Sequence, residues 1–215
     1  MQVLKASEFE DGKVTALFYG PPGIGKTTAV GMLPGKTLII DVDKGTSVLR
    51  GNKNVDVVRL SEDLKDLPAV LKELGAKCPY DNICIDSLSE LERGMLAYFG
   101  RVGNNDGVPG LQDYGRVNYK LVDYCRQYRA LDANVIFTAW EDRREIIAPT
   151  GEKYTQICPL LRDKVVDNVC GLCDMVGRVA VTKEGERVIL LEGSQGLVAK
   201  DRLGKRKILK FGEAV

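Results

Sequence analysis

The sequence predicts an α/β fold: a mainly parallel sheet flanked by helices, with an antiparallel meander at the C-terminal end. Short apolar strands alternate with helical segments through most of the chain, as in sheets that are covered on both faces. A glycine-rich turn over residues 20–25 joins the first strand to the first helix. Three strand patterns separated by short polar turns close the chain and predict the meander.

The first half of the chain supplies four predicted strands, and two of them end in an acid, at Asp41 and Asp86. The strands are expected at residues 14–19, 37–41, 55–60 and 82–86. The helices are expected at residues 26–33, 61–75 and 87–99. Pro34 and Gly35 end the first helix, and Ser61 is the expected N-cap of the second.

The second half begins with a loop, residues 100–111, that is rich in Gly, Asn and Asp. Further helices are expected at residues 113–131 and 160–173, and strands at 134–138, 176–182, 187–191 and 197–200. A two-stranded ribbon is expected at residues 144–157, with its turn at residues 149–152. At about 150 residues per domain, we expect residues 1–215 to form a single domain.

The composition excludes several kinds of chemistry. The 215 residues include no His, so the chain has no Ser-His-Asp triad, no Cys-His pair and no HExxH zinc site. The 31 basic and 30 acidic residues predict no global attraction to nucleic acid, so such a contact has to be local. No apolar run approaches the ~18 residues of a membrane span. Because the N-terminus also lacks the apolar stretch of a signal peptide, we expect a cytoplasmic protein.

Of the six cysteines, only Cys170 and Cys173 have a spacing that is typical of metal ligands. A tetrahedral zinc site needs a second pair, and no other pair has the right pattern. We therefore interpret these two thiols as small apolar residues on a buried helix face.

One run of residues fits the pattern GxxxxGK[ST] in full and stands between a predicted strand and a predicted helix. Its glycines allow backbone N–H groups to surround a phosphate. Lys26 reaches the β- and γ-phosphates, the Thr27 hydroxyl joins a Mg²⁺ shell, and Thr28 bonds the α-phosphate. The predicted nucleotide-binding residues are Gly20, Pro21, Pro22, Gly23, Ile24, Gly25, Lys26, Thr27 and Thr28.

Two acids are expected to complete this site. Asp86 ends an apolar strand and is expected to hold Mg²⁺ through a water molecule. Its neighbour is Ser87 and not Glu, so the base that activates water must come from elsewhere. Asp43, two residues beyond Asp41, is the candidate base. The alternative is that Asp41 and Asp43 only cap their loop.

These motifs resemble those of the RecA-like ATPases. Residues 37–43 are similar to the strand that carries the catalytic acid in RecA, at the position of Asp43, and residues 85–88 are similar to the Walker B strand. Residues 200–204 resemble the Lys-x-Arg element of RadA/Sms proteins and DnaB-type helicases. This resemblance implies that Lys200 and Arg202 neutralise the transition-state charge in a neighbouring subunit's ATP site.

The chain size, the glycine-rich loop and the late Lys-x-Arg element are together similar to a group of phage RecA-like proteins linked to single-strand annealing and recombination. The resemblance implies hydrolysis of ATP with Mg²⁺ and assembly into a ring or a filament. It further implies single-stranded DNA and a single-strand-binding protein as partners, and the cytoplasm of the host cell as the location.

In RecA-like proteins, DNA meets two loops, which correspond here to residues 100–114 and 140–157. The second loop contains Arg143, Arg144, Lys153 and Tyr154. The three cations would pair with phosphates, and the tyrosine ring would stack on a base. The alternative is that these are solvated turn residues.

The same family usually carries a Gln that senses the γ-phosphate at the tip of the strand that corresponds to residues 135–138. Here the strand is followed by Ala139, Trp140 and Glu141. The indole of Trp140 can only donate a hydrogen bond, so it is no substitute for an amide. Thr138 and Glu141 are the candidate replacements.

Two other classes of function remain open at this point. A small P-loop kinase fits the loop and the chain size, but it should also have an Arg-rich lid in mid-chain and a helical C-terminal end. A non-catalytic, ATP-switched DNA-binding or loader module fits the Asp that stands at position 43 in place of Glu.

Overall fold

The computed structural model describes residues 12–61, 63–64, 66–204 and 206–215. Its strands are β1 (Thr15–Tyr19), β2 (Thr37–Asp41), β3 (Val55–Arg59), β4 (Asn82–Asp86), β5 (Asn134–Ala139), β6 (Glu141–Ile147), β7 (Lys153–Pro159), β8 (Met175–Val181), β9 (Arg187–Leu190), β10 (Lys200–Asp201) and β11 (Ile208–Lys210). Its helices are α1 (Lys26–Gly31), α2 (Asp66–Ala76), α3 (Leu88–Val102), α4 (Leu111–Arg129) and α5 (Asp163–Leu172), with a 3-10 turn, η2 (Thr46–Leu49).

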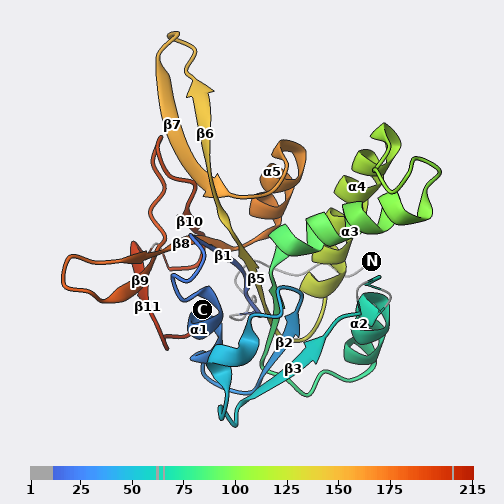
Figure 1. The fold of residues 1–215 in the computed structure, drawn as a ribbon. Coiled ribbons are helices and arrows are strands. Elements are labelled where there is room, and N and C mark those ends of the chain that lie inside the picture. The colour runs from blue at the N-terminus through green and yellow to red at the C-terminus, as the bar shows by residue number, and fades with distance from the viewer. Residues whose placement is uncertain (1–11, 62, 65, 205) are drawn as a thin grey trace, which may run out of the picture.

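The main sheet has the strand order β11-β9-β8-β1-β5-β4-β2-β3, and β10 pairs with β8 beside this path (Figure 1). The strands from β8 to β3 in this order are parallel, whereas β9, β10 and β11 are antiparallel to their partners. The predicted α/β class, with a mainly parallel sheet and antiparallel strands near the C-terminus, is confirmed. The first of the late strands, β8, belongs to the parallel part.

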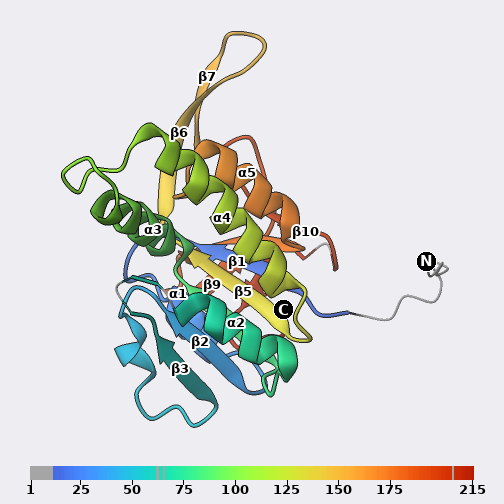
Figure 2. The same ribbon diagram turned by 90° about the vertical axis from the view of Figure 1, so that its right-hand side faces the viewer.

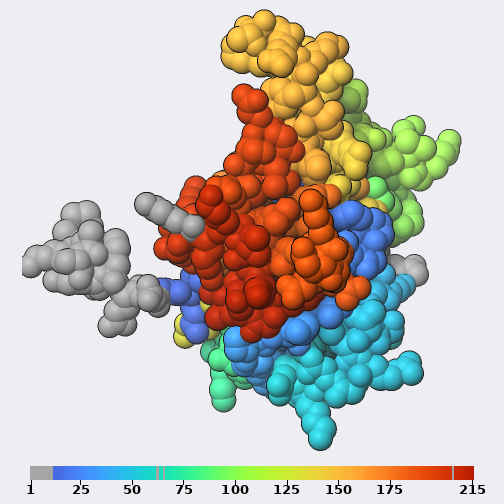
Figure 3. Space-filling model, turned by 90° about the vertical axis from the view of Figure 1, so that its left-hand side faces the viewer, coloured from blue at the N-terminus to red at the C-terminus, as the bar shows by residue number. Residues whose placement is uncertain are grey.

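The two faces of the sheet are covered differently. Helices α2, α3, α4 and α5 lie on one face (Figure 2), where the larger apolar core forms. On the other face, α1 packs against the central strands together with side chains from β9 and β11. Figure 3 shows the C-terminal strands on the surface on this side of the molecule. All five residues of β1, β2 and β4 are buried because these strands are covered on both faces.

Strands β6 and β7 form a separate two-stranded sheet that projects beyond the main sheet (Figures 1 and 3). We call residues 141–159 the hairpin. It begins at Glu141, so it is longer than the predicted ribbon at 144–157. The predicted turn is confirmed, because the Gly151 N–H donates to the Ala148 carbonyl at 2.8 Å. Gly151 has a φ of 84°, which glycine tolerates without strain.

Two sequence-based expectations about local structure are wrong. Helix α2 begins at Asp66, and Ser61 is not its N-cap. Instead, Leu64 has a φ of 57° and the Asp66 carboxylate accepts a hydrogen bond from the Ser61 N–H at 2.8 Å. In place of the strand expected at residues 197–200, the structure has the two-residue strand β10 (Lys200–Asp201). Val198 does not join the main sheet, because its N–H donates to the Ile157 carbonyl of the hairpin at 2.9 Å.

None of the helices in the described part of the chain is long and apolar enough to cross a membrane.

Candidate functional site

The glycine-rich loop joins β1 to α1 in the context that the sequence predicts. Gly23 and Gly25 have φ values of 75° and 107°, a region that side chains with a Cβ rarely adopt. Gly20 is restricted by packing, because a Cβ there would lie 3.1 Å from the carbonyl oxygen of Val179 in β8. Gly23 and Gly25 therefore allow the loop to curl back over the start of α1, and Gly20 allows the close approach of β8.

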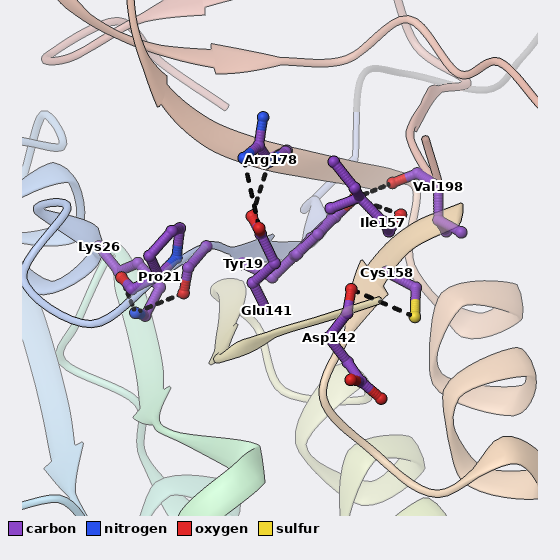
Figure 4. Close-up of polar contacts among 10 residues, drawn as sticks. Tyr19, Pro21, Lys26, Glu141, Asp142, Ile157, Cys158, Arg178 and Val198 are labelled. Carbon is purple, nitrogen blue, oxygen red and sulfur yellow. Dashed lines mark hydrogen bonds and ion pairs between the residues drawn. The ribbon is translucent and has the colours of Figure 1, made fainter. Parts of the chain in front are cut away.

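Lys26 is buried inside this loop, with only 7% of its surface exposed. Its ammonium donates to the carbonyl oxygens of Gly20 and Pro21 at 3.0 Å each (Figure 4). Burial lowers the pKa of Lys26, while the charges of Asp86, Asp43 and Glu141 act in the opposite direction. Because its described hydrogen bonds go to neutral carbonyls, this buried cation is suited to an incoming anion.

Asp86 stands at the carboxyl end of β4 and is 2% exposed. One of its carboxylate oxygens, Oδ2, accepts a hydrogen bond from the Thr27 hydroxyl at 2.6 Å, and Oδ1 accepts one from the Thr138 hydroxyl. Burial raises the pKa of Asp86, and the two hydroxyls partly oppose this effect. The structure therefore brings Thr27 and Asp86 together, as a Mg²⁺ site with a hydroxyl and a carboxylate requires.

Asp43 and Asp41 follow β2 but have different environments. Asp41 accepts hydrogen bonds from the Gly45 N–H at 3.1 Å and from the Thr46 hydroxyl at 2.7 Å, so it caps its own loop. Asp43 Oδ1 accepts from the N–H and the hydroxyl of Ser87, at 3.1 and 2.9 Å. Its Oδ2 accepts from the Trp140 indole at 3.3 Å. These donors hold the Asp43 carboxylate beside Asp86, which Ser87 directly follows.

Six of the nine predicted nucleotide-binding residues and both acids share one cleft of about 350 Å³ at the carboxyl ends of the parallel strands, whereas Gly20, Pro21 and Ile24 do not line it. Ligands of open α/β sheets bind at such edges. The cleft is lined by Pro22, Gly23, Gly25, Lys26, Thr27, Thr28, Asp43, Gly45, Val48, Asp86 and Trp140. Sequence reasoning missed Val48, which carries no motif, and the role of Trp140 as a wall of the cleft.

Neither candidate replacement for the sensor Gln is available as a simple hydrogen-bond donor. Thr138 donates to Asp86, as described above. Glu141 forms an ion pair with Arg178 of β8, in which Nε and Oε2 are 2.7 Å apart (Figure 4). Arg178 was not among the residues predicted from the sequence. A charged residue inside the apolar strand 175–181 was the signal that could have identified it.

Lys200 and Arg202 lie away from this cleft in their own chain. Lys200 pairs with Val176 of β8, which is in register with Leu17, two residues before the end of β1. Arg202 is exposed, and its N–H donates to the carbonyl of Asp174 at 3.1 Å. Burial, together with the nearby charge of Arg202, lowers the pKa of Lys200. Neither side chain lines the cleft that contains Lys26.

The four candidate nucleic-acid residues all lie on the hairpin, but they are not equally accessible. Arg143 and Lys153 are exposed, and Lys153 pairs with Glu145 at 2.9 Å. Arg144 is bound to the body of the molecule, because it pairs with Asp163 of α5 at 2.9 Å and donates to the Leu161 carbonyl. Tyr154 is half-buried and stands opposite Ile146 across the hairpin.

Cys170 lies on α5 and Cys173 immediately follows it, both packed in the core under helices α2 to α5. Burial raises the pKa of Cys170 to about 12 and that of Cys173 well above its ordinary value. Cys173 is buried and Cys170 is partly buried, which agrees with the interpretation of both as small apolar residues of the core. Among the described residues, no three Cys, Asp or Glu side chains gather into a metal-binding group.

The fold and the cleft together define a P-loop nucleotide-binding protein of the α/β class. The chain matches the AAA domain family over residues 12–203 and belongs to that family. None of the curated proteins matches the chain. Among solved structures, the chain is similar to the flagellar accessory protein FlaH from Methanocaldococcus jannaschii. The identity is 13% and the TM-score 0.45, over 91% of this chain and 83% of the FlaH chain.

Proposed function

We propose that this protein is a Mg²⁺-dependent, RecA-like ATPase that assembles on single-stranded DNA. The observation that supports hydrolysis is the convergence of Lys26, Thr27, Asp86 and Asp43 on one cleft. A P-loop that only binds a nucleotide has no need of a second acid fixed beside Asp86. The ATPase class also agrees with membership of the AAA domain family.

In this proposal each residue of the cleft has a distinct task. Lys26 exchanges its bonds to the loop carbonyls for the β- and γ-phosphates, because phosphate oxygens are charged acceptors. Thr27 and Asp86 would hold Mg²⁺, which neutralises the charge that develops on the transferred phosphoryl group. Asp43 orients the attacking water and accepts its proton, while Ser87 and Trp140 keep its carboxylate in place.

We propose that Lys200 and Arg202 complete the site of a neighbouring subunit in a homo-oligomeric ring or filament. Their distance from the cleft of their own chain supports this arrangement, as does the exposure of Arg202. An arginine supplied from outside stabilises the transition-state charge only after assembly. Hydrolysis would then depend on subunit contacts.

For the nucleic acid, we propose that the hairpin carries the contact through Arg143, Lys153 and Tyr154. The hairpin projects from the edge of the sheet that carries the cleft (Figure 1). Arg144 contributes by fixing the hairpin to α5 and not by contacting phosphate. A role in phage recombination, annealing or repair, beside a single-strand-binding protein, fits these features and rests on the sequence resemblance.

The test is the steady-state ATPase rate with and without single-stranded DNA, for wild type, Lys26→Ala and Arg202→Ala. We expect DNA to stimulate the wild type and both variants to be inactive. A mixture of the two variants should regain part of the rate, because some of its interfaces combine an intact P-loop with an intact Arg202. Equal rates with and without DNA, together with an active Arg202→Ala protein, would refute assembly-dependent catalysis on DNA.

The same assay separates the other classes of function. Transfer of phosphate to a nucleoside or nucleotide, measured as acceptor phosphorylation, would identify a kinase. Binding of ATP without turnover would identify a switched loader module. In either case, Lys26→Ala should lose nucleotide binding, which makes this variant the control for the site itself.

A further inference from the structure

A second charged cluster adjoins the P-loop but has no role in the mechanism above. It consists of Glu141, the first residue of β6, and Arg178 in the middle of β8. The guanidinium contacts both carboxylate oxygens, with Nε–Oε2 and Nη2–Oε1 distances of 2.7 and 3.4 Å (Figure 4). The side chain of Glu141 is 9% exposed and that of Arg178 is 24% exposed. Such a two-point, largely buried pair needs both partners in place.

Three observations place this pair close to the phosphate site. Arg178 is in register with Tyr19, the residue that precedes the P-loop. Val179, the next residue of β8, packs its backbone against Gly20. Glu141 also acts on Lys26, because burial lowers the pKa of that ammonium and the negative charge of Glu141 opposes this effect. The pair therefore lies within electrostatic reach of the cation that receives the terminal phosphates.

Glu141 also belongs to the base of the hairpin, which is held to the sheet next to the P-loop. The Tyr19 hydroxyl lies within hydrogen-bond distance of the Ile157 and Val198 carbonyls, at 3.2 and 2.7 Å (Figure 4). Strand β7 is thus bonded to the end of β1 through Tyr19, and strand β6 is bonded to β8 through Arg178. A change in either contact alters the position of the hairpin relative to the nucleotide site.

We propose that Arg178 senses the terminal phosphate within its own chain and passes this information to the hairpin through Glu141. A triphosphate brings negative charge close to Glu141, which repels it, and offers the guanidinium an equally good two-point acceptor. Arg178 then turns from Glu141 to the γ-phosphate and releases the first residue of β6. A diphosphate lacks this acceptor, so the ion pair persists. This inference rests on the proposed binding of ATP in the cleft.

Calorimetric titration with ATPγS and with ADP, each with Mg²⁺, tests the sensor. Arg178→Gln should weaken ATPγS binding about tenfold or more, the value of a charge-assisted hydrogen bond, and change ADP binding by less than about twofold. Glu141→Gln should strengthen ATPγS binding, because it frees the guanidinium. Arg129→Gln is the matched control, since Arg129 pairs at 3.8 Å with Asp174, the residue that precedes β8.

Hydrogen exchange of residues 141–159 tests the link to the hairpin. ATPγS should lower the protection of the hairpin base in the wild type, and ADP should not. This difference should vanish in Arg178→Gln. A merely structural ion pair would give the wild-type hairpin base the same protection with ATPγS as with ADP, and that result would overturn the proposal.

Arg178→Gln leaves Glu141 buried with no cation beside it, which could destabilise the fold. The double variant Arg178→Gln/Glu141→Gln restores a neutral pair and should show the same loss of preference for ATPγS over ADP. If the double variant keeps the wild-type preference, Arg178 is no sensor, although ATP binding stands. If the wild type binds neither nucleotide, the proposed function fails and the sensor with it.

Discussion

Asp86 is subject to opposite demands from stability and from function. Its burial raises the pKa of the carboxyl group, so the folded chain holds the proton more tightly than the unfolded chain. The carboxyl group therefore contributes most to stability at low pH, and this contribution is lost as the pH rises through the folded-state pKa. At neutral pH the ionised Asp86 weakens the fold of the nucleotide-free protein, whereas the proposed function requires this carboxylate to hold Mg²⁺.

We therefore expect Asp86→Asn to be more stable than the wild type at pH 7 and inactive in ATP hydrolysis. A gain of ~1 kcal/mol would raise Tm by about 2–4 °C in a domain of this size. The gain should shrink as the pH falls through the folded-state pKa, where both proteins are neutral at this position. Thermal unfolding without nucleotide between pH 3 and pH 8, about the range in which a carboxyl titrates, measures it.

Asp201→Asn is a control with the opposite sign. Burial acts to raise the pKa of Asp201, but hydrogen bonds from Arg206 and from backbone N–H groups outweigh it and lower that pKa. The ionised form of Asp201 therefore favours the fold, and its removal should lower Tm at pH 7. If both substitutions shift Tm in the same direction, the electrostatic explanation for Asp86 is wrong.

Asp43 is the residue that decides between an ATPase and a passive switch. Asp43→Asn keeps the shape of the side chain and removes its basicity. We expect kcat to fall by about 10²–10⁴-fold, the usual contribution of a general base. ATPγS affinity should stay within about threefold, because Asp43 is not proposed to bind phosphate. Rapid-quench turnover and calorimetry measure the two effects. An Asp43→Asn protein with wild-type kcat would leave Asp43 with a loop-capping role only.

At the scale of elements, the hairpin is separated from the main sheet and is nearly neutral. Residues 141–159 contain the acids Glu141, Asp142, Glu145 and Glu152 and the bases Arg143, Arg144 and Lys153. Since Arg144 pairs with Asp163, Arg143 and Lys153 are the two hairpin cations that we propose to contact phosphate. A small number of contacts predicts weak binding by one copy and stronger binding once several hairpins share a strand.

The double variant Arg143→Ala/Lys153→Ala should weaken single-stranded DNA binding and lower its dependence on salt. Each lost phosphate contact reduces the slope of log K against log[salt] by roughly 0.7 for a single strand. Fluorescence anisotropy over a salt series measures this slope. Lys183→Ala is the control, because Lys183 is an exposed lysine in the turn between β8 and β9. An equal loss per removed charge in both proteins would show that only net charge matters.

At the scale of the whole molecule, catalysis should depend on protein concentration. None of the described residues that line the cleft is an arginine, since Arg178 is paired with Glu141 and Arg202 lies on the surface away from the cleft. The ATPase rate per subunit should therefore rise with concentration until assembly is complete. Arg202→Ala should remain slow throughout, by about 10³-fold or more at saturation. Parallel light scattering shows whether the rate follows assembly. A rate per subunit that is constant while the particle size changes would contradict catalysis between subunits.

The sequence by itself determined the α/β class, the P-loop and the position of Asp86. These features are local: hydrophobic alternation marks strands, glycine marks left-handed backbone, and an acid after an apolar strand marks the carboxyl edge of a sheet. Local patterns also predicted the hairpin turn and the buried position of Cys173. The prediction of an N-cap at Ser61 was wrong, because the backbone at Leu64 is left-handed and helix α2 begins only at Asp66.

Only the tertiary structure decided which distant residues meet. Glu141 and Arg178 are far apart in sequence and come together because β8 lies beside β1 in a particular register. The register of β10 on β8 also places Lys200 away from Lys26. The ion pair of Arg144 with Asp163 of α5 fixes the hairpin to the body of the molecule. Strand order and register follow from the burial of the whole core, so no local segment of the sequence encodes them.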